Sequence, residues 1–280
     1  MPRIVADLGN SRLKWGHVGQ DGRLGKTVAL PTDDLDAWAG TWHDWDLDGT
    51  ETAWSIASVN PPLAERLCRW LGDRGAGPIR WHRSAAEVSV RHDLENPRTA
   101  GADRALAVVG ALGLRGGRGP GLVVSCGTAV TVERISSEGI WQGGAIAPGL
   151  GPMARALHLM TAQLPEVAPR EAPSPFGRST VPALEAGVFW GVVGAIRELL
   201  TRQSLGVFET LGLVVTSPHS NPSPQGGRGP EGVTPLPWLI WTGGDAPTFA
   251  PWVEWPGGSE VVPHLVLEGL RAETLRTENG

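Results

Sequence analysis

The chain has 280 residues, of which 41% are hydrophobic, enough for a sizeable core in one large or two medium domains. The formal net charge is −5, from 24 basic and 29 acidic residues, which argues against nucleic acid or an anionic membrane as the main partner. No apolar run approaches the ~18 residues of a membrane span, and the N-terminus leads directly into a predicted strand, so we expect neither a span nor a signal peptide. Two distant cysteines, Cys68 and Cys126, fit a reducing cytoplasm.

The first half of the chain predicts a hairpin followed by helices. Residues 2–18 alternate around the turn "DLGN", and 53–62 form a short buried strand that ends at prolines. Helical spacing follows over 61–73, and 102–114 predict an almost wholly apolar helix that begins at an acid. The Gly-rich stretch 113–121 is predicted to be a linker.

A second hairpin opens near residue 122, with its turn at "GT" between two apolar strands. Helices are predicted over 151–164, 182–200 and 264–275, and a strand over 236–246 that runs into a Gly-Gly-Asp loop. Because the chain twice opens with a hairpin and continues with helices, we expect a duplicated α/β architecture with a cleft between the halves. The predicted domains are 1–115 and 116–280.

Residues 216–235 differ in composition from the rest of the chain. They are rich in Pro, Gly and Ser and contain almost nothing apolar. Such a segment cannot offset the entropy of ordering, so we predict a disordered surface insertion between two strands.

Two short motifs could carry chemistry. In "DLGN" (Asp7 to Asn10), a carboxylate and a polar Gly turn at a strand end could place Mg²⁺ and backbone donors on a triphosphate. Ordinary hairpin chemistry explains the same residues. In "GADR", Asp103 could be a general base with Arg104 binding an anionic substrate, or simply a helix N-cap.

The order of the motifs is more specific than any one of them. The chain resembles the type III pantothenate kinases of the actin and sugar-kinase superfamily over nearly its whole length. The segments that carry the resemblance are "DLGNSRLK", "SVNPP", "NPRTAGADRALAVVGA", "GTAVTVE", "GGAIAPGLGPMARAL", "FGRST…EAG", "TGGDA" and "LVLEGL". The resemblance implies an α/β fold of two ribonuclease-H-like (actin-like ATPase) domains with a central cleft. It also implies transfer of the ATP γ-phosphoryl group to pantothenate, in coenzyme A biosynthesis.

The resemblance also implies roles for individual residues. Asp103 corresponds to the catalytic base, and Asp7 lies nearest to Mg²⁺. The implied ATP-binding residues are Asp7, Leu8, Gly9, Asn10, Ser11, Arg12, Leu13, Lys14 and Thr128. The implied pantothenate-binding residues are Gly101, Ala102, Asp103, Arg104 and Thr180, with Leu94 at one further pocket position.

Three positions depart from the family pattern. Ser125 stands where the family has an Asp associated with a monovalent cation such as K⁺ or NH₄⁺, so the cation site loses a negative charge. Glu133 replaces an Asp, and Leu94 replaces a Tyr that lines the pantothenate pocket. Asp7, Asp103, Arg104, Thr128 and Thr180 are retained, which favours an active kinase with an altered cation requirement.

Two other functions stay open at this point. One is a non-catalytic or weakened relative that acts as a nucleotide-binding regulatory or accessory factor. The other is a kinase of the same fold that acts on another small alcohol, since fold does not fix substrate. The resemblance further implies a homodimer, to which the apolar helix 182–200 could contribute, and a cytoplasmic protein.

Overall fold

The computed structural model describes residues 3–47, 52–169, 171–210 and 237–276. Contacts divide the chain into two compact units. The first is Met1–Gly117 together with His264–Gly280, and the second is Arg118–Pro263.

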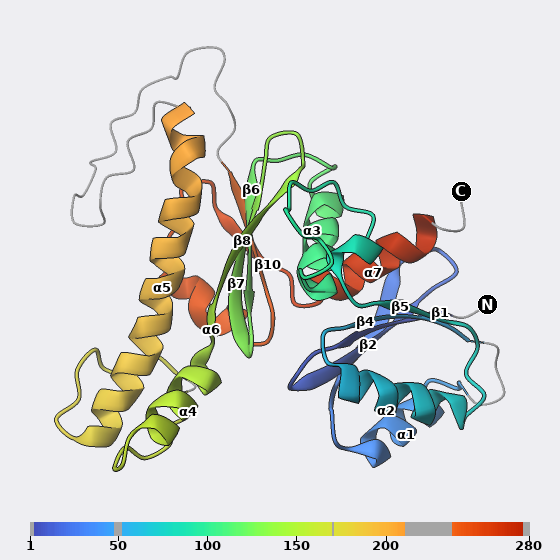
Figure 1. The fold of residues 1–280 in the computed structure, drawn as a ribbon, viewed down its shortest axis with the longest axis horizontal. Coiled ribbons are helices and arrows are strands. Elements are labelled where there is room, and N and C mark those ends of the chain that lie inside the picture. The colour runs from blue at the N-terminus through green and yellow to red at the C-terminus, as the bar shows by residue number, and fades with distance from the viewer. Residues whose placement is uncertain (1–2, 48–51, 170, 211–236, 277–280) are drawn as a thin grey trace. The chain divides into compact units, whose positions relative to one another are not determined.

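The first unit is built on a sheet of the strands β1 (Arg3–Leu8), β2 (Arg12–Val18), β3 (Leu24–Pro31), β4 (Ala53–Ser58) and β5 (Ile79–His82). Its strand order is β3-β2-β1-β4-β5. Figure 1 labels β1, β2, β4 and β5 of this sheet. Strands β1, β2 and β3 are antiparallel neighbours, whereas β4 and β5 run parallel to β1. The carboxyl ends of β1, β4 and β5 therefore lie at one edge of the sheet.

Helices α1 (Leu35–Asp44) and α2 (Pro61–Gly72) cover one face of this sheet around a tryptophan-rich core. Trp15 of β2 packs edge to face on Trp54 of β4, with ring centroids 5.2 Å apart. Trp42 of α1 stacks on Trp54, and Trp70 of α2 meets Trp42 edge to face. These aromatic contacts fix both helices on the sheet, which positions the loop between β4 and α2.

Helices α3 (Ala102–Leu114) and α7 (Leu265–Arg276) pack together in the same unit, with α7 also contacting β1, β2 and β4. The two helices approach closely because Gly110 and Gly269 lack side chains: a Cβ on either would collide with the backbone of Leu265 or Leu106. Helix α7 thus lies in the first unit, whereas the predicted domain 116–280 placed it in the second.

The second unit repeats the strand order of the first. Its strands are β6 (Gly121–Cys126), β7 (Ala129–Ile135), β8 (Trp141–Pro148), β9 (Trp238–Thr242) and β10 (Ser259–Val261), in the order β10-β9-β6-β7-β8. Again the first three are antiparallel and the last two run parallel to the first. The two units therefore share one topology, as expected for a duplicated α/β architecture.

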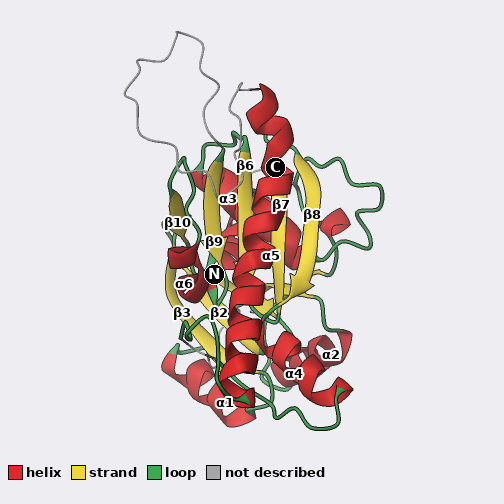
Figure 2. Ribbon diagram, turned by 90° about the vertical axis from the view of Figure 1, so that its left-hand side faces the viewer, coloured by secondary structure: helices red, strands yellow, loops and turns green. Residues whose placement is uncertain are grey.

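The described residues of the second unit also form the helices α4 (Leu150–Met160), α5 (Thr180–Thr210) and α6 (Ala246–Phe249) and the 3₁₀ turn η2 (Ala250–Trp252). Helix α5 runs along the sheet (Figure 2) and buries Phe189, Val193 and Ile196 against β6, β7 and β9. The buried face of the apolar stretch predicted over 182–200 therefore belongs to the core of the second unit.

Most predicted elements are confirmed, including both hairpins and the helices that begin near residues 61, 102, 151, 182 and 264. The predicted insertion at 216–235 lies outside the described residues. The nearest described elements on either side are α5, which ends at Thr210, and β9, which begins at Trp238. Among the described residues, no helix is long and apolar enough to cross a membrane.

Candidate active site

The first hairpin places Asp7 and Lys14 opposite each other. Asp7 is the second-to-last residue of β1, with only 8% of its surface exposed, and it pairs in register with Lys14 of β2. Lys14 Nζ lies 3.3 Å from Asp7 Oδ2, forming an ion pair. The turn is closed by a hydrogen bond from Gly9 N to Arg12 O at 3.1 Å. A carboxylate, an ammonium group and a Gly turn thus meet at one strand end, as a phosphate site requires.

The loop between β4 and α2 lies beside this turn and holds it. Because β1 and β4 run parallel with Leu8 opposite Ser58, both loops leave the same sheet edge. Asn60 Nδ2 donates to Asn10 Oδ1 at 2.9 Å, while Asn60 Oδ1 accepts from Leu63 N at 3.2 Å. One side chain therefore caps α2 and fixes the hairpin turn. Sequence reasoning missed Asn60, although an Asn directly before two prolines and a helix is an N-cap signal.

The "GADR" segment opens α3 in the same unit. Gly101 is the N-cap residue and forms an isolated β-bridge with Ser84. Asp103 lies half-buried in the first turn, and its Oδ1 accepts a hydrogen bond from Arg104 N at 2.9 Å. The N-terminal end of a helix favours a negative charge, and the Asp103 carboxyl group lies at such an end. Arg104 is half-buried beside it.

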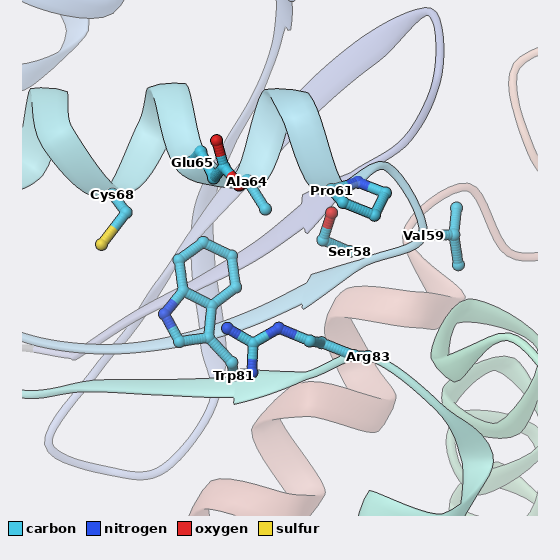
Figure 3. A pocket seen from close by; sticks show the side chains of 8 residues that line it. All are labelled: Ser58, Val59, Pro61, Ala64, Glu65, Cys68, Trp81 and Arg83. Atoms are coloured by element: carbon cyan, nitrogen blue, oxygen red, sulfur yellow. The ribbon is translucent and has the colours of Figure 1, made fainter. Parts of the chain in front are cut away.

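A pocket of about 290 Å³ opens next to these segments (Figure 3). Ser58 and Val59 line it from the β4–α2 loop, and Arg83 lines it from the residue before Ser84. The Arg83 guanidinium lies 5.4 Å from the centre of the Trp81 ring. Pro61, Ala64, Glu65 and Cys68 complete the lining. The predicted substrate residues do not line this pocket. Arg83, which does, follows β5 and precedes Ser84, the bridge partner of Gly101.

Leu94 lies in the segment that precedes Gly101. It is half-buried, and its backbone N–H donates to His92 Nδ1 at 3.3 Å. The segment is fixed to the residues after β5, because Ala85 N donates to Ala100 O and Ala86 N to Pro97 O. An apolar side chain is thus available where the family pattern has a Tyr, without its hydroxyl.

Three Gly-containing loops converge in the second unit. The turn Gly127–Thr128 joins β6 to β7, and Thr128 is exposed at its tip. Gly149 N donates to Thr128 O at 3.0 Å, and Asp245 N donates to Cys126 O at 3.1 Å. The segments "CGTA", "PGL" and "TGGDA" therefore meet at the carboxyl ends of β6 and β9.

Asp245 is a carboxylate at this convergence that sequence reasoning did not assign. It is half-buried at the N-cap position of α6, where its side chain makes no capping hydrogen bond, and burial raises the pKa of its carboxyl group. Burial, followed by the charge of Asp245, raises the pKa of the Cys126 thiol to about 12. Cys126 is therefore a protonated, buried and unreactive thiol within the turn. The "TGGDA" motif was the available signal for Asp245.

Ser125 offers neutral oxygen atoms at the proposed cation position. It is half-buried on β6, with Thr131 and Thr242 as its register partners on the neighbouring strands. Hydroxyl oxygens suit a weakly bound monovalent cation. In the part of the chain that the structure describes, His, Cys, Asp and Glu do not gather in a group of three or more that could hold a metal ion. Mg²⁺ at Asp7 would thus take its other ligands from phosphates and water, which is its usual mode.

Glu133 and Thr180 are not part of the Gly127–Thr128 turn: Glu133 lies within β7, and Thr180 lies at the start of α5. The Glu133 carboxylate is fully buried and accepts from Trp141 Nε1 at 2.9 Å. It lies opposite Gly144, whose missing side chain leaves room for the longer acid. Thr180 is the exposed first residue of α5.

The predicted residues thus form two groups, one in each unit. Asp7 to Lys14, Leu94 and Gly101 to Arg104 lie in the first, and Ser125, Thr128, Glu133 and Thr180 in the second.

Solved structures define the class. The fold matches a Baf family structure from Campylobacter jejuni with a TM-score of 0.57 and 18% identity, over 99% of this chain and 100% of that one. It also matches a 2-dehydro-3-deoxygalactonokinase-type structure from Sinorhizobium meliloti, with a TM-score of 0.51 and 14% identity, over 98% and 99%. The protein shares its two-domain α/β fold with these structures.

Sequence comparison identifies the family. The family model described as type III pantothenate kinase matches residues 3–202. A type III pantothenate kinase of Acidiphilium cryptum is 37% identical over 281 residues, covering 98% of this chain and 94% of the relative. One of Akkermansia muciniphila is 32% identical over 272 residues, covering 97% of each. The chain belongs to the type III pantothenate kinase family.

Proposed function

We propose that this protein is an ATP-dependent pantothenate kinase that forms 4′-phosphopantothenate. The observation that carries the proposal is family membership over most of the chain combined with an acid, Asp103, in the first turn of α3. Phosphoryl transfer needs positioning and charge neutralisation more than covalent help, and Gly turns with one base supply both.

The nucleotide end of the reaction is assigned to both hairpin turns. Residues 7 to 14 of the first turn and Thr128 of the second bind the ATP phosphates through backbone N–H groups and hydroxyls. Asp7 holds Mg²⁺, which when bound offsets phosphate charge. Lys14, already paired with Asp7 at 3.3 Å, keeps that carboxylate oriented toward the turn.

The acceptor end is assigned to the start of α3. Asp103 takes the proton from the terminal hydroxyl of pantothenate as that oxygen forms a bond to the γ-phosphorus, and ADP leaves with the bonding electrons. Arg104 binds the anionic substrate, while Gly101 and Ala102 bring the backbone close. Leu94 contributes an apolar wall, and Thr180 a hydroxyl.

The proposal also includes a monovalent cation, K⁺ or NH₄⁺, bound more weakly than it would be with a carboxylate at position 125. Ser125 and its threonine neighbours provide neutral oxygens in place of a carboxylate. We therefore expect weaker dependence on the cation than an Asp at this position would give.

A homodimer and a cytoplasmic location complete the proposal. Helix α4 and the start of α5 pack together in the second unit and leave large apolar side chains exposed. Leu157, Leu159, Met160, Phe176 and Val181, here called the α4–α5 patch, are 37% to 83% exposed. Clustered exposure of this kind marks protein interfaces, and a second copy is the proposed occupant. Both cysteines are free, in keeping with a reducing compartment.

The curated relatives that match most of the chain are named as type III pantothenate kinases, which favours the main proposal over the regulatory alternative. The retained Asp7 and Asp103 also favour catalysis. A kinase for another small alcohol is separated from the main proposal by testing pantothenate against other hydroxy acids.

The test is ADP release from ATP, Mg²⁺ and pantothenate by wild type and Asp103→Asn. Loss of the base should lower kcat by about 10²-fold or more while ATP affinity, measured by calorimetry, stays nearly unchanged. Asp36→Asn is the matched control, because Asp36 lies in the first turn of α1 and its loss has a similar effect on a helix end. Wild-type turnover in Asp103→Asn would contradict the base assignment. Absence of turnover in wild type with ATP still bound would favour the regulatory alternative.

A further inference from the structure

The residues that follow β5 form a bracket around the segment leading to Asp103. The 3₁₀ turn η1 (Ala85–Glu87) follows β5 directly. Ala85 N donates to Ala100 O at 2.8 Å and Ala86 N to Pro97 O at 3.2 Å. Ser84 bridges Gly101, the N-cap of α3. The position of Gly101 therefore depends on the position of η1.

His82 connects η1 to the sheet. It is the last residue of β5 and is fully buried. Its Nδ1 lies 3.1 Å from Glu87 O, and its Nε2 lies 3.1 Å from Ser55 Oγ on β4. A carbonyl oxygen can only accept, so Nδ1 carries the proton, and Nε2 accepts from the Ser55 hydroxyl. The neutral ring thus satisfies both nitrogens and ties η1 to β4.

Charged groups around His82 come from three elements. Arg80 lies on β5, Glu87 on η1 and Glu273 on α7. Burial is the largest influence and lowers the pKa of His82. The charge of Arg80 acts in the same direction, while Glu87, Glu273 and the hydrogen bond to the Glu87 backbone oppose it. The balance favours the neutral ring.

A second link fixes the far side of η1. Ser89 N donates to Glu273 Oε2 at 3.0 Å, and Arg276 Nη1 donates to Ser89 O at 2.7 Å. The bracket is thus held at His82 by β4 and at Ser89 by α7. Of these anchors, His82 is the one whose hydrogen-bond pattern changes with a proton near neutral pH.

We propose that His82 is a positioning residue for the acceptor site: through η1 it sets the place of Gly101 and Asp103, and its protonation releases them. This inference rests on the proposed function, in which Asp103 is the base. A proton on Nε2 reverses the direction of the Ser55 hydrogen bond, because Nε2–H then donates to the hydroxyl, and it puts a charge into a buried site beside Arg80. The cost of that buried charge shifts the ring and loosens η1. Misplacement of Asp103 then raises the KM for pantothenate more than the KM for ATP.

The test compares wild type, His82→Gln and the control His43→Gln, which changes an exposed histidine of α1. For His82→Gln we expect a KM for pantothenate raised by about tenfold, with the KM for ATP changed by less than about twofold. In wild type, kcat/KM for pantothenate should fall as the pH drops below about 6.5. His82→Gln should lack this step, and His43→Gln should keep it.

Hydrogen exchange gives a readout that is independent of activity. Amides of residues 85–101 should exchange faster in His82→Gln than in wild type at pH 7.5, with the second unit unchanged. If wild type binds ATP but does not phosphorylate pantothenate, the proposed function falls, and exchange alone decides whether His82 holds this segment. An unchanged KM, an unchanged pH step or unchanged exchange would overturn the inference.

Ser55→Ala is the second variant, in case His82→Gln does not fold. It removes the hydroxyl that contacts Nε2, so the pH at which the step occurs should differ from that of wild type. A step at the wild-type pH would equally overturn the inference.

Discussion

Ser125 and Asp245 lie near the same turn and differ in what they bring to it. Ser125 supplies a neutral hydroxyl on β6, and Asp245 supplies a half-buried carboxyl from the loop after β9. The sequence motif drew attention to the first position, because a carboxylate is missing there. It did not predict the second, because the hydrogen bond from Asp245 N to Cys126 O joins residues 119 positions apart in the chain.

Restoring the acid should restore cation dependence. Ser125→Asp adds a negative charge among the hydroxyl oxygens of Thr131 and Thr242, and turnover should become dependent on potassium relative to sodium. Ser137→Asp, an exposed change on the turn between β7 and β8, is the control. Equal turnover of Ser125→Asp in both salts would contradict the assignment of this position.

The roles of Asp103 and Lys14 were predictable to different degrees. The start of α3 at an acid follows from local sequence, and the structure places Asp103 in its first turn. The ion pair between Lys14 and Asp7 depends on hairpin register, which motif spacing alone does not give.

Helix α2 depends on one capping side chain that also serves the candidate site. Asn60→Ala should lower the free energy of unfolding by about 1 kcal/mol through loss of the N-cap. It should also raise the KM for ATP, because Asn10 loses its 2.9 Å hydrogen bond and the hairpin turn becomes less ordered.

The matched control is Asp34→Ala, which removes the same kind of cap from α1. Asp34 Oδ1 accepts from Ala37 N at 2.9 Å and has no link to the hairpin turn. Chemical denaturation should give similar losses of stability for the two variants. A similar KM for ATP in both would mean that the Asn60–Asn10 contact does not serve nucleotide binding.

Elements with strong local signals were predicted, and edge elements were not. Both hairpins follow from alternating apolar residues around Gly turns. Strand β3 has mostly exposed or half-buried residues, β8 contains consecutive glycines, and β5 has only four residues. Each lies at the edge of its sheet. An edge strand packs against few other residues, so its alternation of apolar and polar residues is weak.

Assembly of the whole molecule should depend on the α4–α5 patch. Leu159 is 65% exposed, and Leu159→Glu would place a charge in the proposed interface. Sedimentation velocity should give a dimer for wild type and a monomer for this variant. Leu35→Glu, the same change at a 39% exposed leucine on α1, should remain a dimer. A monomeric wild type, or a dimeric Leu159→Glu, would contradict the proposed interface.

The duplicated architecture was predictable from the repeated hairpins, but the membership of the last helix was not. The pattern of α7 indicates a helix with one apolar side, and many partners would satisfy it. Its packing on α3 requires a glycine on each helix at the point of contact, Gly110 on α3 and Gly269 on α7. These two glycines are about 160 residues apart in the chain. Such pairings are decided by shape in three dimensions.

The position of α7 has a consequence for how the protein is made. A ribosome releases residues of the first unit, then the entire second unit, and only at the end Leu265, Leu267 and Leu270, whose side chains are fully buried. The second unit is continuous and can fold during translation. The first must wait with part of α3 uncovered until its final helix emerges. A nascent chain stalled before residue 264 would therefore be the form most in need of a chaperone.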